Sequence, residues 1–492
     1  MLTLQRLLNG VQYEMLQGDS AAMVSGVEYD SRRIEAGNAF VCISGFNQDG
    51  HDFASQAVAN GANSLIVERS LIAPENCNVV LVQDTRAVLP VLAANFYGRP
   101  SEKLRVVGVT GTNGKTTTTH LIRSILEESG YKVGLLGTLY ASFGDYEEHL
   151  ANTTPESLDI ERFMHRVAQG GGSHVIMEVS SHALDLGRVD EIDFDVAVFT
   201  NFTQDHLDYH KSMESYCRAK LKLFAGLSSA DDQYGIINND DDYAEAFLQT
   251  GKAKKISYGI KNHADVRAGN IHIGPRGSSM DIDFPGGKMR CNTKLAGIFN
   301  VYNSLAAISV GIAENVAPDV IRKGIEKVAG VPGRFELIDE GQNYSVIVDY
   351  AHTPDGLENI LKTAREIAEA RIITVFGAGG DRDRTKRPLM GRIAAQYSDF
   401  SIITSDNPRS EDPLAIIDEI MVGVKENDRA HYAIVPDRRE AIRHSVYLAN
   451  KDDLVIIAGK GHEDYQIIKG EILPFDDRRI AREYIKEKER HE

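Results

Sequence analysis

Paired cysteines and long apolar runs are missing from this sequence. Its four cysteines form no C-x-x-C pair, which argues against a disulfide framework or a structural zinc site and indicates reduced, buried thiols. No apolar run approaches the roughly 18–20 residues that cross a bilayer, and the N-terminus lacks the apolar stretch and cleavage site of a signal peptide. We therefore expect a soluble, cytoplasmic protein that does not insert into a membrane.

Positive charge is also in short supply, and tryptophan is absent. The chain has 54 Lys and Arg against 71 Asp and Glu, a net charge of −17 at pH 7. This balance argues against sequence-independent DNA or RNA binding, which needs clustered positive charge. A hydrophobic share of 42% excludes disorder as the dominant state. The 492 residues are too many for one hydrophobic core and suggest about three domains.

From residue 104 onward, apolar β-branched runs alternate with helical segments. Runs such as LRVVGVTG and HVIMEVSS are typical of strands buried on both faces of a parallel sheet. A Gly-rich stretch within residues 252–294 predicts an antiparallel excursion. The polar segment 97–103 and the turn at 331–333 predict domain boundaries. The expected fold class is α/β, with three domains over residues 1–100, 101–331 and 332–492.

The segment Gly108-Val-Thr-Gly-Thr-Asn-Gly-Lys-Thr-Thr117 lies between a predicted strand and a predicted helix. Its inner glycines let backbone N–H groups approach phosphate oxygens, and the helix N-terminus adds partial positive charge. Lys115 can reach the β- and γ-phosphates of ATP, and Thr116 can ligate Mg²⁺. The general phosphate-loop pattern places a glycine where this chain has Val109, so G-T-N-G-K-T is a subtype. The predicted ATP-binding residues of the loop are Gly111, Thr112, Asn113, Gly114, Lys115, Thr116 and Thr117.

Carboxylates and an imidazole follow two further predicted strands. Glu178 ends the run HVIME, and Asp205, His206 and Asp208 come after the run VAVFTNF. At strand ends close to a phosphate loop, such groups suit metal ions that neutralise a transferring phosphate. His206 alone would equally fit a hydrogen-bonded core or helix-cap histidine. The predicted metal ligands are Thr116, Glu178 and His206.

Seven motifs occur in order along the chain. They are Gly111-Thr-Asn-Gly-Lys-Thr116, Asn152-Thr-Thr-Pro155, Glu178-Val-Ser-Ser-His182, Asn201 to Asp208, Asn300-Val-Tyr-Asn303, Gly333-Arg-Phe-Glu336 and Asp349-Tyr-Ala-His-Thr-Pro354. This series resembles the Mur ligases, the ATP-dependent amide-forming enzymes of bacterial peptidoglycan synthesis. The resemblance implies a smaller N-terminal α/β domain that binds UDP, a central phosphate-loop ATPase with a mostly parallel sheet, and a C-terminal Rossmann-like domain that binds an amino acid.

Carried over position by position, the resemblance implies roles for further residues. Lys220, in Cys217-Arg-Ala-Lys220, matches the family's carbamylated lysine (N6-carboxylysine), although by itself it would be taken for a surface lysine. A carbamate is an anion that can face metal ions, whereas a bare ammonium would be repelled by them. The implied catalytic residues are Lys115, Glu178, His206 and Lys220; the further ATP contacts are Asn300, Asn303, Arg334 and Asp349; and the UDP-muramoyl-dipeptide site comprises Ser31, Asn152, Thr153, Thr154, Ser180 and Arg188.

The C-terminal domain is expected to choose the incoming amino acid. Asp406-Asn-Pro-Arg409 follows the run FSIITS and resembles the motif of family members that add meso-diaminopimelate. Lysine lacks the second carboxylate of diaminopimelate, which Arg409 can clamp with two parallel hydrogen bonds. A buried arginine left unpaired would penalise lysine, and Glu463 is suited to accept the ligand's ammonium group. The implied amino-acid-binding residues are Arg382, Asp406, Asn407, Pro408, Arg409, Gly459 and Glu463.

The resemblance implies a two-stage reaction. The free carboxylate of UDP-N-acetylmuramoyl-L-alanyl-D-glutamate attacks the γ-phosphate of ATP to give an acyl phosphate, and the amine of meso-diaminopimelate then displaces phosphate. Mg²⁺ is the expected cofactor, and the protein is expected to act as a monomer without nucleic acid. Three alternatives stay open: a lysine-adding Mur ligase, a ligase similar to folylpolyglutamate synthetases, and a phosphate-loop switch or nucleic-acid-stimulated ATPase, against which the acidic balance weighs.

Overall fold

The computed structural model of the chain describes residues 1–45 and 48–491. Its backbone contacts divide the chain into two units. The first consists of Met1–Asp265 and Ala306–Val320, and the second of Val266–Leu305 and Ile321–Glu492. The domain limits suggested by the sequence, at residues 100 and 331, stay a prediction. Within the described residues, no helix is both long enough and apolar enough to span a membrane.

The N-terminal part of the first unit is a five-stranded sheet in the order β2-β7-β6-β5-β4. The strands from β4 to β7 are parallel, and β2 is antiparallel to β7. Side chains alternate along each strand, so the two faces of the sheet contribute to two hydrophobic cores. Val41 packs with residues of α1 and α3 on one face, and Phe40 packs with residues of α2 on the other. The elements of this part are β1 (Leu2–Thr3), α1 (Leu4–Leu7), β2 (Glu14–Gln17), β3 (Met23–Val24), β4 (Gly26–Glu28), β5 (Asn38–Val41), α2 (Ala54–Ala59), β6 (Ser64–Val67), β7 (Asn78–Leu81) and α3 (Thr85–Tyr97).

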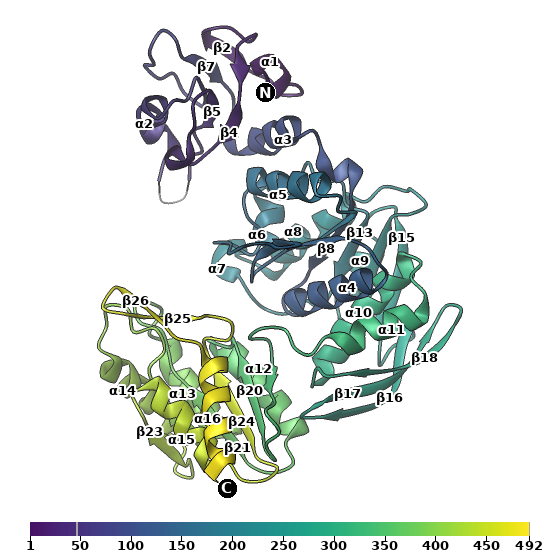
Figure 1. Cartoon of the computed structure of the whole chain (residues 1–492), viewed down its shortest axis with the longest axis vertical. Helices are drawn as coiled ribbons and strands as arrows, with labels where there is room; N and C mark the ends of the chain where they lie inside the picture. The colour runs from purple at the N-terminus through teal and green to yellow at the C-terminus, as the bar shows by residue number, and fades with distance from the viewer. Residues whose placement is uncertain (46–47, 492) are drawn as a thin grey trace. The chain divides into compact units, whose positions relative to one another are not determined.

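The rest of the first unit is built on a sheet in the order β11-β10-β9-β12-β8-β13-β14-β15. The strands from β9 to β15 in this order are parallel, and α4 and α5 lie on opposite faces of the sheet (Figure 1). The elements are β8 (Arg105–Thr110), α4 (Lys115–Glu128), β9 (Val133–Leu136), β10 (Ala141–Phe143), β11 (Tyr146–Glu148), α5 (Ser157–Gln169), β12 (His174–Glu178), α6 (Ser181–Asp185), β13 (Val196–Phe199), α7 (Leu207–His210), α8 (Met213–Ala225), β14 (Tyr234–Asn238), α9 (Ala244–Leu248) and β15 (Lys254–Gly259).

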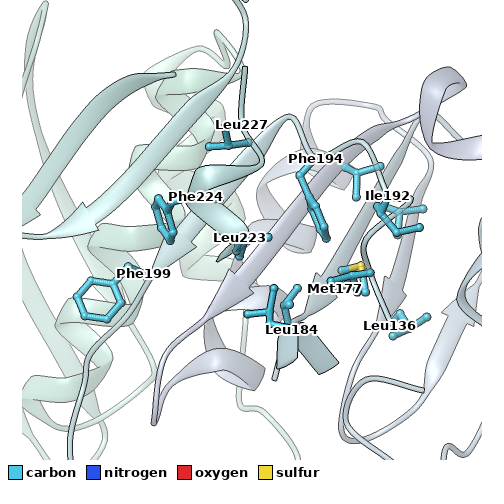
Figure 2. Close-up of a cluster of buried hydrophobic side chains, with 14 of the residues drawn as sticks. Leu136, Met177, Leu184, Ile192, Phe194, Phe199, Leu223, Phe224 and Leu227 are labelled. Carbon is cyan, nitrogen blue, oxygen red and sulfur yellow. The ribbon is translucent and has the colours of Figure 1, made fainter. Parts of the chain in front are cut away.

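The hydrophobic core of this sheet supports β8 directly before the glycine loop. Figure 2 shows Phe194 and Leu223 among the buried side chains of this core. A Cβ at Gly108 would lie 2.7 Å from the Phe194 ring and 3.2 Å from a methyl group of Leu223. The third residue before the loop therefore has to be glycine for the core to close beneath it.

The second unit combines three consecutive antiparallel strands and a separate two-stranded hairpin with an α/β sheet. Strands β16, β17 and β18 pair antiparallel, which confirms the antiparallel excursion expected within residues 252–294. The α/β sheet has the order β19-β20-β24-β21-β22-β23, and all its pairs except β19–β20 are parallel. Alternating residues of its strands pack against α12, α13 and α14 on one face and against α15 and α16 on the other. The α/β fold class expected from the sequence is confirmed.

The elements of the second unit are given next in chain order. They are β16 (Val266–Gly274), β17 (Gly277–Phe284), β18 (Gly287–Thr293), α10 (Ile298–Ala313), α11 (Pro318–Lys327), β19 (Glu336–Ile338), β20 (Ser345–Asp349), α12 (Pro354–Ile367), β21 (Ile372–Phe376), α13 (Lys386–Tyr397), β22 (Phe400–Ile403), α14 (Pro413–Val424), β23 (Tyr432–Ile434), α15 (Arg438–Leu448), β24 (Leu454–Ala458), β25 (Tyr465–Ile468), β26 (Glu471–Pro474) and α16 (Asp477–His491). The end of α10 and the start of α11 fall in the segment Ala306–Val320, which is assigned to the first unit.

A fully buried ion pair joins the first residues of α15 and α16. Arg438 donates from Nε and Nη2 to the two carboxylate oxygens of Asp477 at 2.8 and 2.6 Å, and neither side chain is exposed. We expect Asp477→Asn to lower the free energy of unfolding of this unit by about 3 kcal/mol, because it leaves a buried guanidinium without its counter-charge. Urea denaturation followed by circular dichroism measures the change.

The matched control for this prediction is Glu483→Gln on the same helix. Glu483 pairs with Arg439 across the same two helices, but both side chains are about half exposed. Its loss should cost less than about 1 kcal/mol. Equal effects of the two substitutions would contradict the importance of burial.

Candidate functional site

The glycine loop between β8 and α4 is shaped by two glycines with positive φ. Gly111 has φ 145°, and Gly114, the N-cap of α4, has φ 85°. A Cβ at Gly111 would lie 1.9 Å from Thr200 Oγ1, so a side chain there would collide with the residue that follows β13. The loop runs from the buried end of a strand directly into a helix N-terminus, an arrangement that binds phosphate groups.

The residues that follow β13 hold the loop in this conformation. The N–H group of Thr112 donates to the Asn201 carbonyl at 2.8 Å, and the N–H group of Asn113 donates to Asn201 Oδ1 at 2.9 Å. Thr200 Oγ1 donates to the Asn113 carbonyl at 2.6 Å. The hydrogen bonds of Thr112 and Asn113 to the residues after β13 thus fix the shape of the loop.

Two lysine side chains converge on one carbonyl oxygen of the loop. Nζ of Lys115 and Nζ of Lys220 each donate to the Gly111 carbonyl at 2.8 Å, and Lys115 also donates to the Thr112 carbonyl at 2.8 Å. Lys220, on α8, is 1% exposed. Burial, together with the neighbouring Lys115 ammonium, holds the pKa of Lys220 well below its usual range. Lys220 is therefore a buried amine beside the phosphate loop and not the surface lysine that its sequence context suggests.

Glu178, at the end of β12, is a buried carboxylate beside the first turn of α4. It accepts hydrogen bonds from Thr116 Oγ1 at 3.0 Å, from the Thr138 N–H group at 2.9 Å and from Thr138 Oγ1 at 3.1 Å. Thr138 Oγ1 also lies 3.0 Å from Thr153 Oγ1. The structure thus brings together three predicted site residues. The sequence assigns Thr116 to ATP and the metal, Glu178 to the metal and Thr153 to the muramoyl-dipeptide substrate.

A second group of predicted residues lies just beyond Glu178. Thr154 Oγ1 donates to the Glu178 carbonyl at 2.9 Å and accepts from the Ser180 N–H group at 3.0 Å. Arg188 donates to the Thr154 carbonyl at 2.9 Å and to Glu156 Oε1 at 2.8 Å. Thr154, Ser180 and Arg188 therefore form one hydrogen-bonded group at this edge of the sheet.

Two further predicted substrate residues, Ser31 and Asn152, take no part in these hydrogen bonds. Ser31 is buried in a short helical turn, Ser31–Arg33, and its carbonyl accepts from Asn60 Nδ2 at 2.8 Å. Asn152 is exposed. No hydrogen bond links Ser31 to Thr153, Thr154, Ser180 or Arg188 in the part of the chain that the structure describes.

His206 has a positive φ of 53° and a half-exposed side chain. Its Nε2 lies 3.6 Å from Asp205 Oδ2. Burial lowers the pKa of His206; Lys115 and Lys220 act in the same direction, and Asp205 opposes them. A neutral imidazole is the form that binds metal ions. Within residues 1–45 and 48–491, no three His, Cys, Asp or Glu side chains form a cluster that could hold a metal ion.

Mg²⁺ nevertheless suits the donors beside the loop. It prefers oxygen ligands and usually keeps several waters, binding through one or two protein groups plus the phosphates of the nucleotide. Thr116 Oγ1 and the Glu178 carboxylate, joined at 3.0 Å, are such groups. The assignment of Thr116, Glu178 and His206 as ligands stays a prediction.

In the second unit, the predicted nucleotide residues form two local clusters. Asn303 Nδ2 donates to Asn300 Oδ1 at 3.0 Å, both on α10. The Asp349 carboxylate accepts from the N–H groups of Phe335 at 2.7 Å and Ala351 at 2.8 Å, and burial raises its pKa against the opposing charge of Arg334.

Arg334 itself is held against an aromatic ring. Its guanidinium lies 5.3 Å from the centre of the Tyr350 ring. Its buried Nε has no hydrogen-bond partner among the described residues. An unpaired buried donor of this kind is available to an anionic ligand.

The predicted amino-acid residues gather where β22 and β24 end. Arg409 has a positive φ of 52°, and its Nη1 donates to the Gly380 carbonyl at 2.7 Å. A Cβ at Gly379 would lie 2.9 Å from Arg409 Nη1 and 3.7 Å from Arg382 Cγ. Two arginine side chains therefore flank Gly379, as recognition of a carboxylate would require.

Glu463 lies in a hydrogen-bonded triangle with two buried residues. Its Oε2 accepts from Asn407 Nδ2 at 3.0 Å and from Lys460 Nζ at 3.1 Å. Beside this triangle, a Cβ at Gly459 would lie 2.7 Å from Oδ2 of Asp406. That buried oxygen has no hydrogen-bond partner within the described chain. The carboxyl ends of these parallel strands thus carry both cationic and anionic groups, as a zwitterionic ligand needs.

Comparison with known proteins decides the family. Three family models match the chain: "Mur ligase family, catalytic domain" at residues 23–97, "Mur ligase middle domain" at 109–311 and "Mur ligase, glutamate ligase domain" at 333–461. A UDP-N-acetylmuramoyl-L-alanyl-D-glutamate–2,6-diaminopimelate ligase of Syntrophomonas wolfei is 52% identical over 99% of this chain and 100% of its own. The chain belongs to the Mur ligase family.

Further relatives of this Mur ligase carry the same name. The ligase of Geobacillus thermodenitrificans is 48% identical over 94% of this chain and 95% of its own length. A solved structure titled UDP-N-acetylmuramoyl-L-alanyl-D-glutamate–2,6-diaminopimelate ligase matches with a TM-score of 0.72 and 30% identity, covering 99% of both chains. The similarity therefore extends over the whole chain and its fold.

Motif matching in this Mur ligase missed two residues that the structure places at the candidate site. Thr138 donates twice to Glu178, but it lies in a loop after β9 with no motif around it. Lys460 stands inside the segment Gly459-Lys-Gly-His-Glu463 and could have been noticed. Its spacing from Glu463 carries no signal by itself, because the i,i+3 pairing rule applies to helices and this segment is a turn.

Proposed function

We propose that this Mur ligase uses ATP to join meso-2,6-diaminopimelate to UDP-N-acetylmuramoyl-L-alanyl-D-glutamate, a step of peptidoglycan biosynthesis. The observation that carries the proposal is its 52% identity, over 99% of the chain, to a ligase of that name. The geometry agrees, because a phosphate loop, a buried carboxylate and a pair of arginines each occupy the end of a parallel sheet. We further propose that the enzyme acts in the cytoplasm as a monomer and needs no nucleic acid.

ATP supplies the phosphoryl group that activates the carboxylate. The turn at Gly111 and Gly114 and the start of α4 receive its phosphates, and Lys115 leaves the loop carbonyls to meet the β- and γ-phosphates. Thr116 and Glu178, with His206 toward the second substrate, would hold Mg²⁺, which neutralises phosphate charge when bound. We assign Asn300, Asn303, Arg334 and Asp349 to the rest of the nucleotide.

The muramoyl dipeptide brings the carboxylate that reacts. We assign Ser31 to its UDP end and Asn152, Thr153, Thr154, Ser180 and Arg188 to its peptide end. The carboxylate oxygen attacks the γ-phosphorus, the bond to ADP breaks, and an acyl phosphate forms. The amine of diaminopimelate then attacks the acyl carbon, loses a proton and expels inorganic phosphate. The protein's residues chiefly position the reacting groups and stabilise the charge that develops on them. No covalent nucleophile is required.

Lys220 is proposed to act as a carbamate. Burial lowers the pKa of its amine, which favours the neutral form that attacks CO₂. The bond from nitrogen to CO₂ forms as a proton leaves, and the product is an anion. Such an anion beside the loop can face the cations that accompany the phosphates, which an ammonium group cannot.

Omission of substrates tests the proposed function. Phosphate release from ATP should require both UDP-N-acetylmuramoyl-L-alanyl-D-glutamate and meso-diaminopimelate, and L-lysine should support little of it. Release with lysine alone would favour a lysine-adding Mur ligase, and release with a folate substrate would favour the synthetase alternative. Release without any acceptor would favour a phosphate-loop switch.

Arg409→Lys tests the clamp for the second carboxylate. We expect KM for diaminopimelate to rise about 30-fold, since lysine cannot make two parallel hydrogen bonds and such charged pairs contribute about 2 kcal/mol. Initial rates at saturating ATP measure the change. Arg429→Lys, an exposed arginine in the loop after α14, is the control and should leave KM unchanged. An unaltered KM in Arg409→Lys would refute the clamp.

A further inference from the structure

Lys460 is a buried cation with no part in the reaction described above. None of its surface is exposed. Its Nζ donates to Asn407 Oδ1 at 3.0 Å and to Glu463 Oε2 at 3.1 Å, and it lies 5.5 Å from the centre of the Tyr465 ring. Removing an ammonium group from water is costly unless it is paired and hydrogen-bonded. The role of Lys460 is therefore to be sought in the two residues to which it donates, Asn407 and Glu463.

The two oxygens of Glu463 have different surroundings. Oε2 accepts from both Lys460 and Asn407. Oε1 accepts no hydrogen bond from any residue that the structure describes, and the Glu463 side chain is 17% exposed. One oxygen is thus anchored in the interior while the other stays open to a ligand.

Asn407 can take only one orientation in this arrangement. Its Oδ1 accepts from the Ile467 N–H group at 3.0 Å and from Lys460 Nζ at 3.0 Å. Both of these groups are donors only, so the amide oxygen has to face them. The amide nitrogen then points to Glu463. Lys460 therefore holds Glu463 directly and shares with the Ile467 N–H group the orientation of Asn407.

We propose that Lys460 is a positioning residue that aims the open oxygen of Glu463 at the ammonium group of the incoming amino acid. The inference rests on the proposed function for the identity of that amino acid. A carboxylate whose rotation is restricted offers its acceptor in one direction, so less freedom is lost when the ligand binds. Lys460 thereby contributes to amino-acid recognition without touching the amino acid.

Lys460→Met in the full chain tests the proposal. Methionine is unbranched like lysine but offers no donor. We expect KM for diaminopimelate to rise about tenfold to a hundredfold, the usual contribution of hydrogen bonds to charged groups. KM for ATP and for the muramoyl dipeptide should stay unchanged, as should kcat at saturating diaminopimelate, because only ligand binding is affected. An unchanged KM for diaminopimelate, or equal rises for all three substrates, would overturn the proposal.

Lys488→Met is the matched control. Lys488 is also buried, in α16, and its Nζ donates to the carbonyl groups of Val446 at 3.2 Å and Ala449 at 2.6 Å. Both substitutions remove a buried ammonium and should lower the melting temperature. Only Lys460→Met should raise KM for diaminopimelate; the same rise in Lys488→Met would assign the effect to general destabilisation.

Two further measurements separate this inference from the proposed function. In a Glu463→Gln background, Lys460→Met should change KM much less than it does alone, because it acts through Glu463. In a crystal structure of Lys460→Met, the Glu463 carboxylate should leave its present contact with Asn407. A wild-type protein without turnover on diaminopimelate would refute the proposed function, whereas an unmoved Glu463 carboxylate in the variant would refute the role of Lys460.

Discussion

Lys220→Ala should lower kcat by about a thousandfold, the upper end of the usual effect of removing one preorganised electrostatic group from a reacting site. The substitution removes the only atoms of α8 that reach the Gly111 carbonyl through a described hydrogen bond, and with them the proposed carbamate. Phosphate release under saturating substrates measures the loss. Binding of ADP, followed by fluorescence, should persist because the loop is also held by Asn201.

A neighbouring lysine and a small carboxylate supply the controls for this prediction. Lys222→Ala, two residues along the same helix, removes a half-exposed lysine and should leave kcat within a factor of two, as surface substitutions usually do. Formate or acetate can enter the space left in Lys220→Ala and should restore part of the rate. Carbon-13 bicarbonate should label the wild-type protein but not this variant. Full activity in Lys220→Ala would refute the carbamate.

The second large effect is expected at Glu178. Glu178→Gln keeps the shape of the side chain and can still accept from the Thr138 N–H group, but it removes the negative charge. We expect kcat to fall by about a hundredfold to a thousandfold and the Mg²⁺ concentration needed for half-maximal rate to rise. Initial rates measured across a Mg²⁺ titration test both changes.

Another buried glutamate of the same unit gives the matched control. Glu161, on α5, is 1% exposed, and burial raises its pKa to about 8. It is already neutral at pH 7, so Glu161→Gln exchanges one uncharged side chain for another and should leave kcat and the Mg²⁺ dependence unchanged. A loss of activity in both variants would point to disturbed packing and not to the charge of Glu178.

Sequence reasoning predicts which side chains meet wherever they follow the ends of neighbouring strands. The runs ending at Thr110 and Glu178 are buried strands in the structure, and they pair in parallel. Two such strands bring their carboxyl ends to one edge, which is why Thr116 and Glu178 meet although they are 62 residues apart. The same principle places Asp406 and Gly459 side by side in the second unit.

Burial and side-chain direction are harder to predict. Nothing in the sequence around Lys220 shows that it lies beneath the loop, because its burial depends on strands more than a hundred residues away. The segment 97–103 has the composition of a linker, yet Pro100 and Ser101 are buried in a short helical turn, Pro100–Lys103. Polar composition indicates where a chain can turn, whereas packing decides whether the turn stays exposed.

Lys115 and Lys220 share the Gly111 carbonyl as a hydrogen-bond acceptor. The chemical state of Lys220 can therefore influence the binding of ATP through Lys115. The carbonyl oxygen has two acceptor positions, and the ammonium of Lys115 and the amine of Lys220 occupy both. In the proposed reaction, Lys115 gives up its hydrogen bond to this oxygen in order to reach the phosphates of ATP. A carbamate on Lys220 would change the interactions that Lys115 gives up. By thermodynamic reciprocity, whatever carbamylation does to ATP affinity, ATP does to the carbamylation equilibrium. Under the proposed carbamylation of Lys220, any such coupling would make the affinity for ATP depend on dissolved CO₂.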